Sequence, residues 1–251
     1  FMVVLPPDFS RAVVRGERPA VLVSVDATDP SASGNAIAAL NGMAAQALQR
    51  DLVGPLAALR PREAPFELRI HRRYNPEGLS RVNIVPGLIG TILTMTMVML
   101  TGLAMTRERE RGTMENLLAT PVRPIEVMLG KIAPYVLIGY IQLGVILLAA
   151  RALFEVPMAG SFGLLMSMIG VFMLANLCVG FTFSTLAKNQ LQALQATFFF
   201  FLPSMLLSGF MFPFRGMPIW AQRVGEVLPL THFLRIVRGI LLKGNGLAQL
   251  L

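Results

Sequence analysis

The side chains that could do chemistry gather in one short stretch of this chain, between Arg107 and Lys131. The stretch holds five basic and four acidic side chains, and long uncharged apolar runs flank it on both sides. Charge at this density is excluded from hydrocarbon, so the stretch must return to water between two membrane crossings.

The interior of this stretch predicts a short amphipathic helix over residues 113–120. Thr113 is a suitable N-cap, Glu115 lies in the first turn where the helix dipole favours an acidic group, and Pro121 ends the helix. The apolar residues that fall on one face are Met114, Leu117 and Leu118. Such a helix, held between two spans, suits docking against a partner protein. A plain solvated turn between two spans is the alternative.

The composition indicates that lipid is the solvent for much of the chain. Of 251 residues, 54% are apolar and only 14% are charged, and the mean hydropathy is +0.62. A soluble globular protein is nearer 25% charged. The net charge is +8, but the basic residues are scattered and are not grouped with aromatic residues, which argues against nucleic-acid binding. The single cysteine, Cys178, can form neither an internal disulfide nor a metal site of its own.

Four uncharged runs are long enough to cross a membrane, because about 20 helical residues span roughly 30 Å of hydrocarbon. The expected spans are residues 82–106, 132–150, 162–187 and 190–213. Glycines expected at sites of close helix packing are Gly139, Gly144, Gly170 and Gly180. The following segment, 215–243, predicts two short re-entrant or interfacial helices, with Trp220 at headgroup depth.

Residues 1–80 differ from the rest of the chain. Short apolar runs rich in β-branched residues alternate with helical patterns in the order strand–helix–strand–helix–strand, which predicts a small α/β domain. The expected fold class is therefore a polytopic α-helical membrane protein with a small α/β extramembrane domain at its N-terminal end. The expected domains are residues 1–80 and 82–251.

The spans contain almost no ionisable side chain away from their ends. Ion-driven transporters usually keep carboxylates or histidines in the membrane as coupling sites, so this pattern argues against an ion-coupled carrier. Energy for transport would then come from a partner. The polar residues that could line a translocation path are Thr91, Thr94, Gln142 and Asn176. Buried hydrogen bonding between helices is the alternative role for these four side chains.

The charged stretch resembles the cytoplasmic signature of type-2 ABC transporter permeases, and is most similar to the drug-exporter branch that includes daunorubicin-resistance permeases. The residues that carry the resemblance are Arg107-Glu108, Glu110-Arg-Gly-Thr113, Glu115, Leu118, Thr120-Pro121, Glu126 and Gly130-Lys131. The resemblance extends over nearly the whole chain. It includes Pro-Pro-Asp-Phe9, Val25-Asp26, Leu228-Pro-Leu-Thr231 and Lys243-Gly244.

The resemblance implies a permease subunit in a bacterial inner membrane, with residues 1–80 external and 107–131 cytoplasmic. It implies six membrane helices, of which this chain would lack the first and nearly all of the sixth. The helix at 113–120 would be the coupling helix that docks into a nucleotide-binding ATPase subunit. The docking residues would be Glu108, Glu110, Gly112, Thr113, Glu115, Leu117, Leu118, Thr120 and Pro121.

The resemblance also implies which chemistry lies outside this chain. ATP and Mg²⁺ would bind the partner subunit, and the sequence contains no Gly-x-x-x-x-Gly-Lys-Ser/Thr loop, so this chain would be no enzyme and would bind no cofactor. A second permease copy or a paralogue would complete a dimer in the lipid bilayer, and the dimer would export an amphipathic or lipid-like substrate, as in multidrug efflux. An ion-coupled carrier and a non-transporting scaffold with a working external domain are the alternatives.

Overall fold

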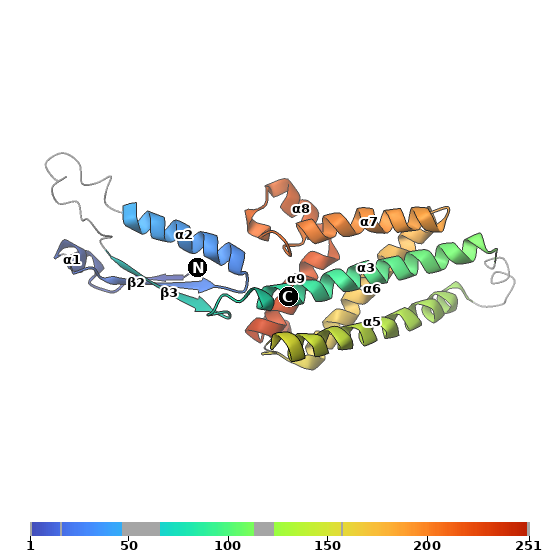
Figure 1. Ribbon diagram of the computed structural model, residues 1–251, viewed down its shortest axis with the longest axis horizontal. Helices are drawn as coiled ribbons and strands as arrows, with labels where there is room; N and C mark the ends of the chain where they lie inside the picture. The colour runs from blue at the N-terminus through green and yellow to red at the C-terminus, as the bar shows by residue number, and fades with distance from the viewer. Residues whose placement is uncertain (1, 16, 47–65, 113–122, 157, 250–251) are drawn as a thin grey trace. The chain divides into compact units, whose positions relative to one another are not determined.

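The computed structural model describes residues 2–15, 17–46, 66–112, 123–156 and 158–249. The chain separates into two compact units, Phe1–Ser80 and Arg81–Leu251. A small sheet occurs in the first unit, whereas the second is helical (Figure 1). This confirms the expected fold class, a helical membrane protein with a small N-terminal α/β region.

The N-terminal unit contains a three-stranded sheet in the order β1-β2-β3. Strand β1 (Met2–Val4) is antiparallel to β2 (Ala20–Asp26), and β3 (Glu67–Arg73) is parallel to β2. Helix α1 (Phe9–Val14) connects β1 to β2, and α2 (Pro30–Gln46) follows β2. The order of these elements matches the sequence-based expectation. The structure describes this second helix as far as Gln46, and residues 47–65 lie outside the described residues.

One face of this sheet forms the core of the N-terminal unit. Strand β2 alternates buried and less buried side chains, the pattern of a strand with one covered face. The buried side chains of β2 are Val21, Val23 and Val25. Helix α2 covers this face and contributes Ile37 to the cluster (Figure 1). The rings of Phe9 and Phe66 meet edge to face, with their centroids 5.9 Å apart.

Four helices of the second unit are long and apolar enough to cross a membrane, among the residues that the structure describes. They are α3 (Ser80–Glu110), α5 (Pro124–Phe154), α6 (Phe162–Leu186) and α7 (Gln190–Leu207). Helix α3 is the most buried of the four, and α5 is the least buried. This difference makes α3 the central element of the unit and leaves most of α5 facing its surroundings.

Helix α5 is longer than the uncharged run that predicted it. The sequence-based span, 132–150, stopped at charged residues, but the helix begins at Pro124 and continues through Arg151 to Phe154. Proline at the first helical position suits the start, and the Glu126 carboxylate accepts a hydrogen bond from the backbone N–H of Arg123 at 3.1 Å. Charge limits how deeply a helix can enter hydrocarbon, but it does not end the helix.

The predicted fourth span, 190–213, is wrong at its C-terminal end, because α7 stops at Leu207. Gly209 adopts a left-handed conformation with φ +85°, which an α-helix cannot continue through. Its carbonyl oxygen then accepts a hydrogen bond from the Arg238 guanidinium at 3.2 Å. The apolar residues that follow therefore form a turn and not a last helical turn.

Residues 219–243 form two helices, as expected, and the second is largely buried. Helix α8 (Ile219–Val227) leaves Trp220 68% exposed, whereas α9 (Pro229–Lys243) buries one whole face. The ring of Phe233 stacks on Phe172 of α6 with centroids 3.9 Å apart. Within the helical unit, α8 and α9 lie at the end where α3 begins (Figure 1). Their depth in the membrane stays a prediction.

Candidate functional site

The last turn of α3 carries three consecutive charged residues, Glu108, Arg109 and Glu110, and each contacts a different neighbouring helix. Helix α3 ends here, and its chain then turns at Gly112, which has a φ of +70°. The chain leaves α3 here and continues toward residues 113–120, the predicted coupling helix. The three contacts therefore define how the start of that segment is held.

Glu108 pairs with α5. Its carboxylate forms an ion pair with the ammonium group of Lys131, and both side chains are partly buried. The two residues lie 23 positions apart, on either side of the predicted coupling helix. The pair therefore joins α3 to α5 on the two sides of the segment that the structure does not describe.

Arg109 contacts the C-terminal end of α6. Its guanidinium donates hydrogen bonds to the carbonyl oxygens of Ala187 at 3.2 Å and Thr185 at 3.4 Å. The last carbonyls of a helix have no intrahelical partner and carry the negative end of the helix dipole. The Arg109 guanidinium supplies hydrogen-bond donors to these carbonyls, and its positive charge is favoured at the negative end of the dipole.

Glu110 contacts the N-terminal end of α7. Its carboxylate accepts a hydrogen bond from the backbone N–H of Gln190 at 2.8 Å and another from the side-chain amide of the same residue. An acidic group at a helix N-terminus is favoured by the dipole. Glu110 lies beyond the uncharged run of α3. The side-chain and backbone hydrogen bonds from Gln190 hold the pKa of the Glu110 carboxyl below its ordinary value.

Together these contacts form a charged clamp, which we define as Glu108, Arg109, Glu110, Lys131 and Gln190 with the two carbonyls at the end of α6. Three adjacent residues of α3 thus hold α5, α6 and α7. Each charge has a partner of opposite sign or a helix terminus of the matching polarity. The end of α3 therefore contacts all three of the other candidate spans.

Most of the predicted docking residues lie outside the described residues. These are Thr113, Glu115, Leu117, Leu118, Thr120 and Pro121, and the proposed coupling helix itself falls with them. The structure describes the remaining three, Glu108, Glu110 and Gly112. Glu108 and Glu110 belong to the clamp, which engages this chain's own helices. Docking of a partner by the whole set stays a prediction.

The four polar residues predicted for a translocation path all take part in hydrogen bonds within the helical unit. Thr91, Thr94 and Asn176 are at most 5% exposed, and each donates a hydrogen bond to a carbonyl of its own helix. Gln142 is partly buried and accepts a hydrogen bond from Thr96 of α3 at 2.9 Å. One of the four therefore has the interhelical bonding that was the alternative, and a role in a path stays a prediction.

Three residues of the clamp, Arg109, Lys131 and Gln190, were absent from the sequence-based site. Arg109 belongs to the charged run, but nothing in that run shows which of its charges meets a helix end. Gln190 lies 80 positions from Glu110 and carries no local signal for the contact. Among the described residues, no group of three His, Cys, Asp or Glu side chains could hold a metal ion.

Comparison of the sequence with known proteins shows which family this chain resembles. Residues 1–251 match the protein family described as "ABC-2 family transporter protein". The chain is 30% identical over 246 residues to a probable multidrug ABC transporter permease, YbhR of Escherichia coli K12. It is 31% identical over 254 residues to the inner membrane transport permease YhhJ of the same organism. No solved structure matches the chain significantly.

The chain covers only part of these relatives. Each alignment includes 98% of this chain, but 66% of YbhR and 65% of YhhJ. A more distant similarity, 26% over 164 residues, links it to ABC transporter G family member 20 of Dictyostelium discoideum, of which it covers 22%. The resemblance to ABC permeases that the sequence predicted is therefore confirmed, whereas activity, substrate and partners do not follow from the match.

Proposed function

Because this chain belongs to the ABC-2 family of transporter proteins, we propose that it is the membrane-spanning permease of an ATP-driven exporter. The energy would come from ATP hydrolysed, with Mg²⁺, on a separate nucleotide-binding subunit. The chain itself would provide the membrane path and would carry out no chemical reaction. A second copy of the permease, or a paralogue, would complete the transporter.

The charged clamp is the observation that carries this proposal. A permease driven from outside the bilayer needs a rigid connection between the docking segment and the spans. The clamp supports the proposal, because it joins the α3 residues that precede the proposed coupling helix, 113–120, to the other three candidate spans. A push on the docking segment would move the helices together and not one at a time.

The proposed orientation places residues 107–131 in the cytoplasm and residues 1–80 outside. An ATPase must lie where ATP is, so the end that carries the clamp would face the cytoplasm of a bacterial cell. The proposed substrate is amphipathic or lipid-like, because the described spans offer no Asp, Glu, Lys, Arg or His side chain away from their ends to bind a strongly polar cargo. Related chains are named as multidrug permeases, which agrees with this substrate class.

The test is association with a nucleotide-binding subunit encoded beside this chain. We expect Glu115→Arg and Leu118→Asp to weaken co-purification of that ATPase about tenfold or more. Each change places a mismatched charge in the proposed contact, and 1.4 kcal/mol is a tenfold change in affinity. Membrane insertion of both variants should remain normal, and the stimulation of ATP hydrolysis should fall with binding.

Unchanged association and stimulation in both variants would contradict the docking role of residues 113–120. Transport that persists without any ATPase subunit and follows an ion gradient would instead support an ion-coupled carrier. A chain that neither transports nor stimulates an ATPase would support a scaffold. The Ile138→Leu variant is a suitable control, since it changes an exposed apolar side chain of α5 to another of similar volume.

A further inference from the structure

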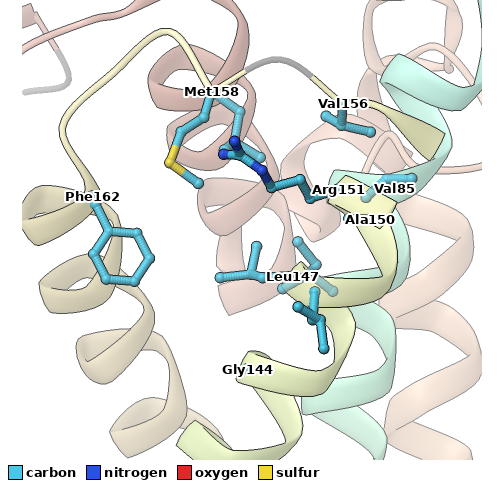
Figure 2. A pocket seen from close by; sticks show the side chains of 11 residues that line it. Val85, Gly144, Leu147, Ala150, Arg151, Val156, Met158 and Phe162 are labelled. Carbon is cyan, nitrogen blue, oxygen red and sulfur yellow. The ribbon is translucent and has the colours of Figure 1, made fainter. Parts of the chain in front are cut away.

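A cavity of about 400 Å³ lies at the end of the helical unit opposite the charged clamp. Its walls come from four helices and are almost entirely apolar. The principal wall residues are Val85, Ile89, Leu147, Leu148, Phe162 and Leu241. Figure 2 shows Phe162 of α6 facing Leu147 and Gly144 of α5 across the space. The walls of this cavity suit hydrocarbon and do not suit a polar solute.

The cavity lies near one end of α5. It extends along α5 from Arg151 to Gly144, and α5 ends at Phe154. Seven residues separate Gly144 from Arg151, which is about 10 Å of helix, so the cavity fits within one half of the roughly 30 Å hydrocarbon core. Leu148 and Phe162 are 71% and 54% exposed. Because α5 and α6 are candidate membrane spans, their exposed side chains face hydrocarbon and the cavity opens toward the bilayer.

A single positive charge stands at the shallow end of this apolar space. The Arg151 guanidinium extends toward Met158 at the upper end of the cavity (Figure 2). Among the described residues, no carboxylate forms an ion pair with Arg151. The nearest acidic residue in sequence, Glu155, lies one turn later and is paired with Arg81 at 4.0 Å. The charge of Arg151 is therefore available to an anion at the membrane surface.

Gly144 shows that the deep end of the cavity is open space. A Cβ atom added at this position would meet no atom within 4 Å. The sequence predicted Gly144 as a site of close helix packing, and that prediction is wrong. It holds for Gly180 of α6, where an added Cβ would lie 2.6 Å from the backbone oxygen of Val98. At Gly144 the missing side chain enlarges the cavity and brings no helix closer.

We propose that this cavity binds an anionic phospholipid of the leaflet opposite the charged clamp. One acyl chain occupies the apolar space, and the phosphate group lies against Arg151. The position within one leaflet, the lateral opening and the single cation all fit this one occupant. The proposal requires only that the helices cross a membrane, so it does not depend on ATP-driven export.

The experiment measures lipid bound to the purified chain in detergent. Phosphatidylglycerol and phosphatidylcholine with identical acyl chains are titrated separately, and bound lipid is counted by native mass spectrometry. We expect phosphatidylglycerol to bind about fivefold more tightly, since one basic side chain at an anionic lipid surface contributes about that factor. Arg151→Gln should remove this preference, and Arg151→Lys should keep most of it.

Gly144→Leu tests the apolar part of the site. The new side chain enters open space, so folding should be retained while binding of both lipids falls severalfold. Gly130→Leu is the matched control, because Gly130 lies near the other end of α5 and an added Cβ there also meets no atom within 4 Å. Arg223→Gln is the control for charge, since Arg223 is an exposed residue of α8, which lies at the same end of the helical unit, and it does not line the cavity.

Three results would overturn the proposal. The first is equal binding of the two lipids by the unaltered chain. The second is a loss of preference in Arg223→Gln as large as that in Arg151→Gln, which would show a general effect of surface charge. The third is a Gly144→Leu chain that binds lipid normally but no longer dimerises, which would show that a second copy covers the cavity.

Discussion

At the end of the helical unit where α3 stops, Glu108, Arg109 and Glu110 each contact a different helix, whereas at the end where α3 begins, Arg151 stands over an apolar cavity. The first end has charges matched to partners and to helix termini. The second has a charge with no ionic partner among the described residues, beside space that side chains do not fill. Charged side chains join the helices at the first end. The second end has the apolar cavity in which we propose that a lipid binds.

The two ends of the helical unit differ in how closely their helices contact one another. Polar contacts between residues 76 to 80 positions apart connect the end of α3 to the C-terminal end of α6 and to the N-terminal end of α7. At the cavity, α5 and α6 are separated by open space near Gly144 and Phe162. The helices are therefore joined by polar side chains at one end of the unit and leave open space between them at the other.

The largest effect that we expect comes from filling the close contact between α3 and α6. Gly180→Leu places atoms where the Val98 backbone oxygen lies, so it should destabilise the chain by about 1–3 kcal/mol or more. Gly144→Leu, the same substitution in open space, should leave the melting temperature nearly unchanged. Thermal unfolding in detergent measures both. Equal destabilisation would mean that the cavity end is packed as closely as the middle of the bundle.

A second prediction concerns the clamp contact with α7. Glu110→Lys places a cation at a helix N-terminus and removes the acceptor for Gln190, so the clamp should open at this helix. Stimulation of the partner ATPase should fall severalfold, because motion of the docking segment would no longer reach α7. Glu77→Lys, a reversal of an exposed charge in the N-terminal unit, is the control. Full stimulation in Glu110→Lys would separate the clamp from coupling.

A third and smaller effect is expected at the clamp contact with α5. Glu108→Lys and Lys131→Glu should each lower stability by about 1 kcal/mol or less, since the pair is only partly buried. The double variant restores opposite charges and should regain most of that loss, which a double-mutant cycle on thermal unfolding measures. Purely additive losses would show that these two residues do not interact in the membrane-embedded chain.

Several elements follow directly from local sequence. The four spans are evident from apolar runs of sufficient length, and the order of elements in residues 1–80 follows from alternating strand and helix patterns. The end of α7 could also have been found, because Gly209 followed by Pro213 is a common helix-stop pattern. The apolar residues between them concealed it. Hydropathy measures compatibility with lipid and does not report where a helix ends.

The candidate site likewise has features that the sequence predicts and contacts that it does not predict. The charged stretch, its resemblance to ABC permeases and its need for water were all readable from the residues themselves. The partners of Glu108, Arg109 and Glu110 were not, because each lies 23 to 80 positions away on a different helix. No periodicity or composition encodes which helix end a given charge will meet.

The sequence by itself determined that this chain is a membrane-spanning member of a transporter family, because membrane spans and family motifs are properties of contiguous residues. Only the tertiary structure decided what the charges and glycines do. Gly144 and Gly180 look alike in an apolar helix, yet one opens a cavity and the other allows two helices to touch. The difference depends on which neighbours the fold brings near, and distance in space is not written in local sequence.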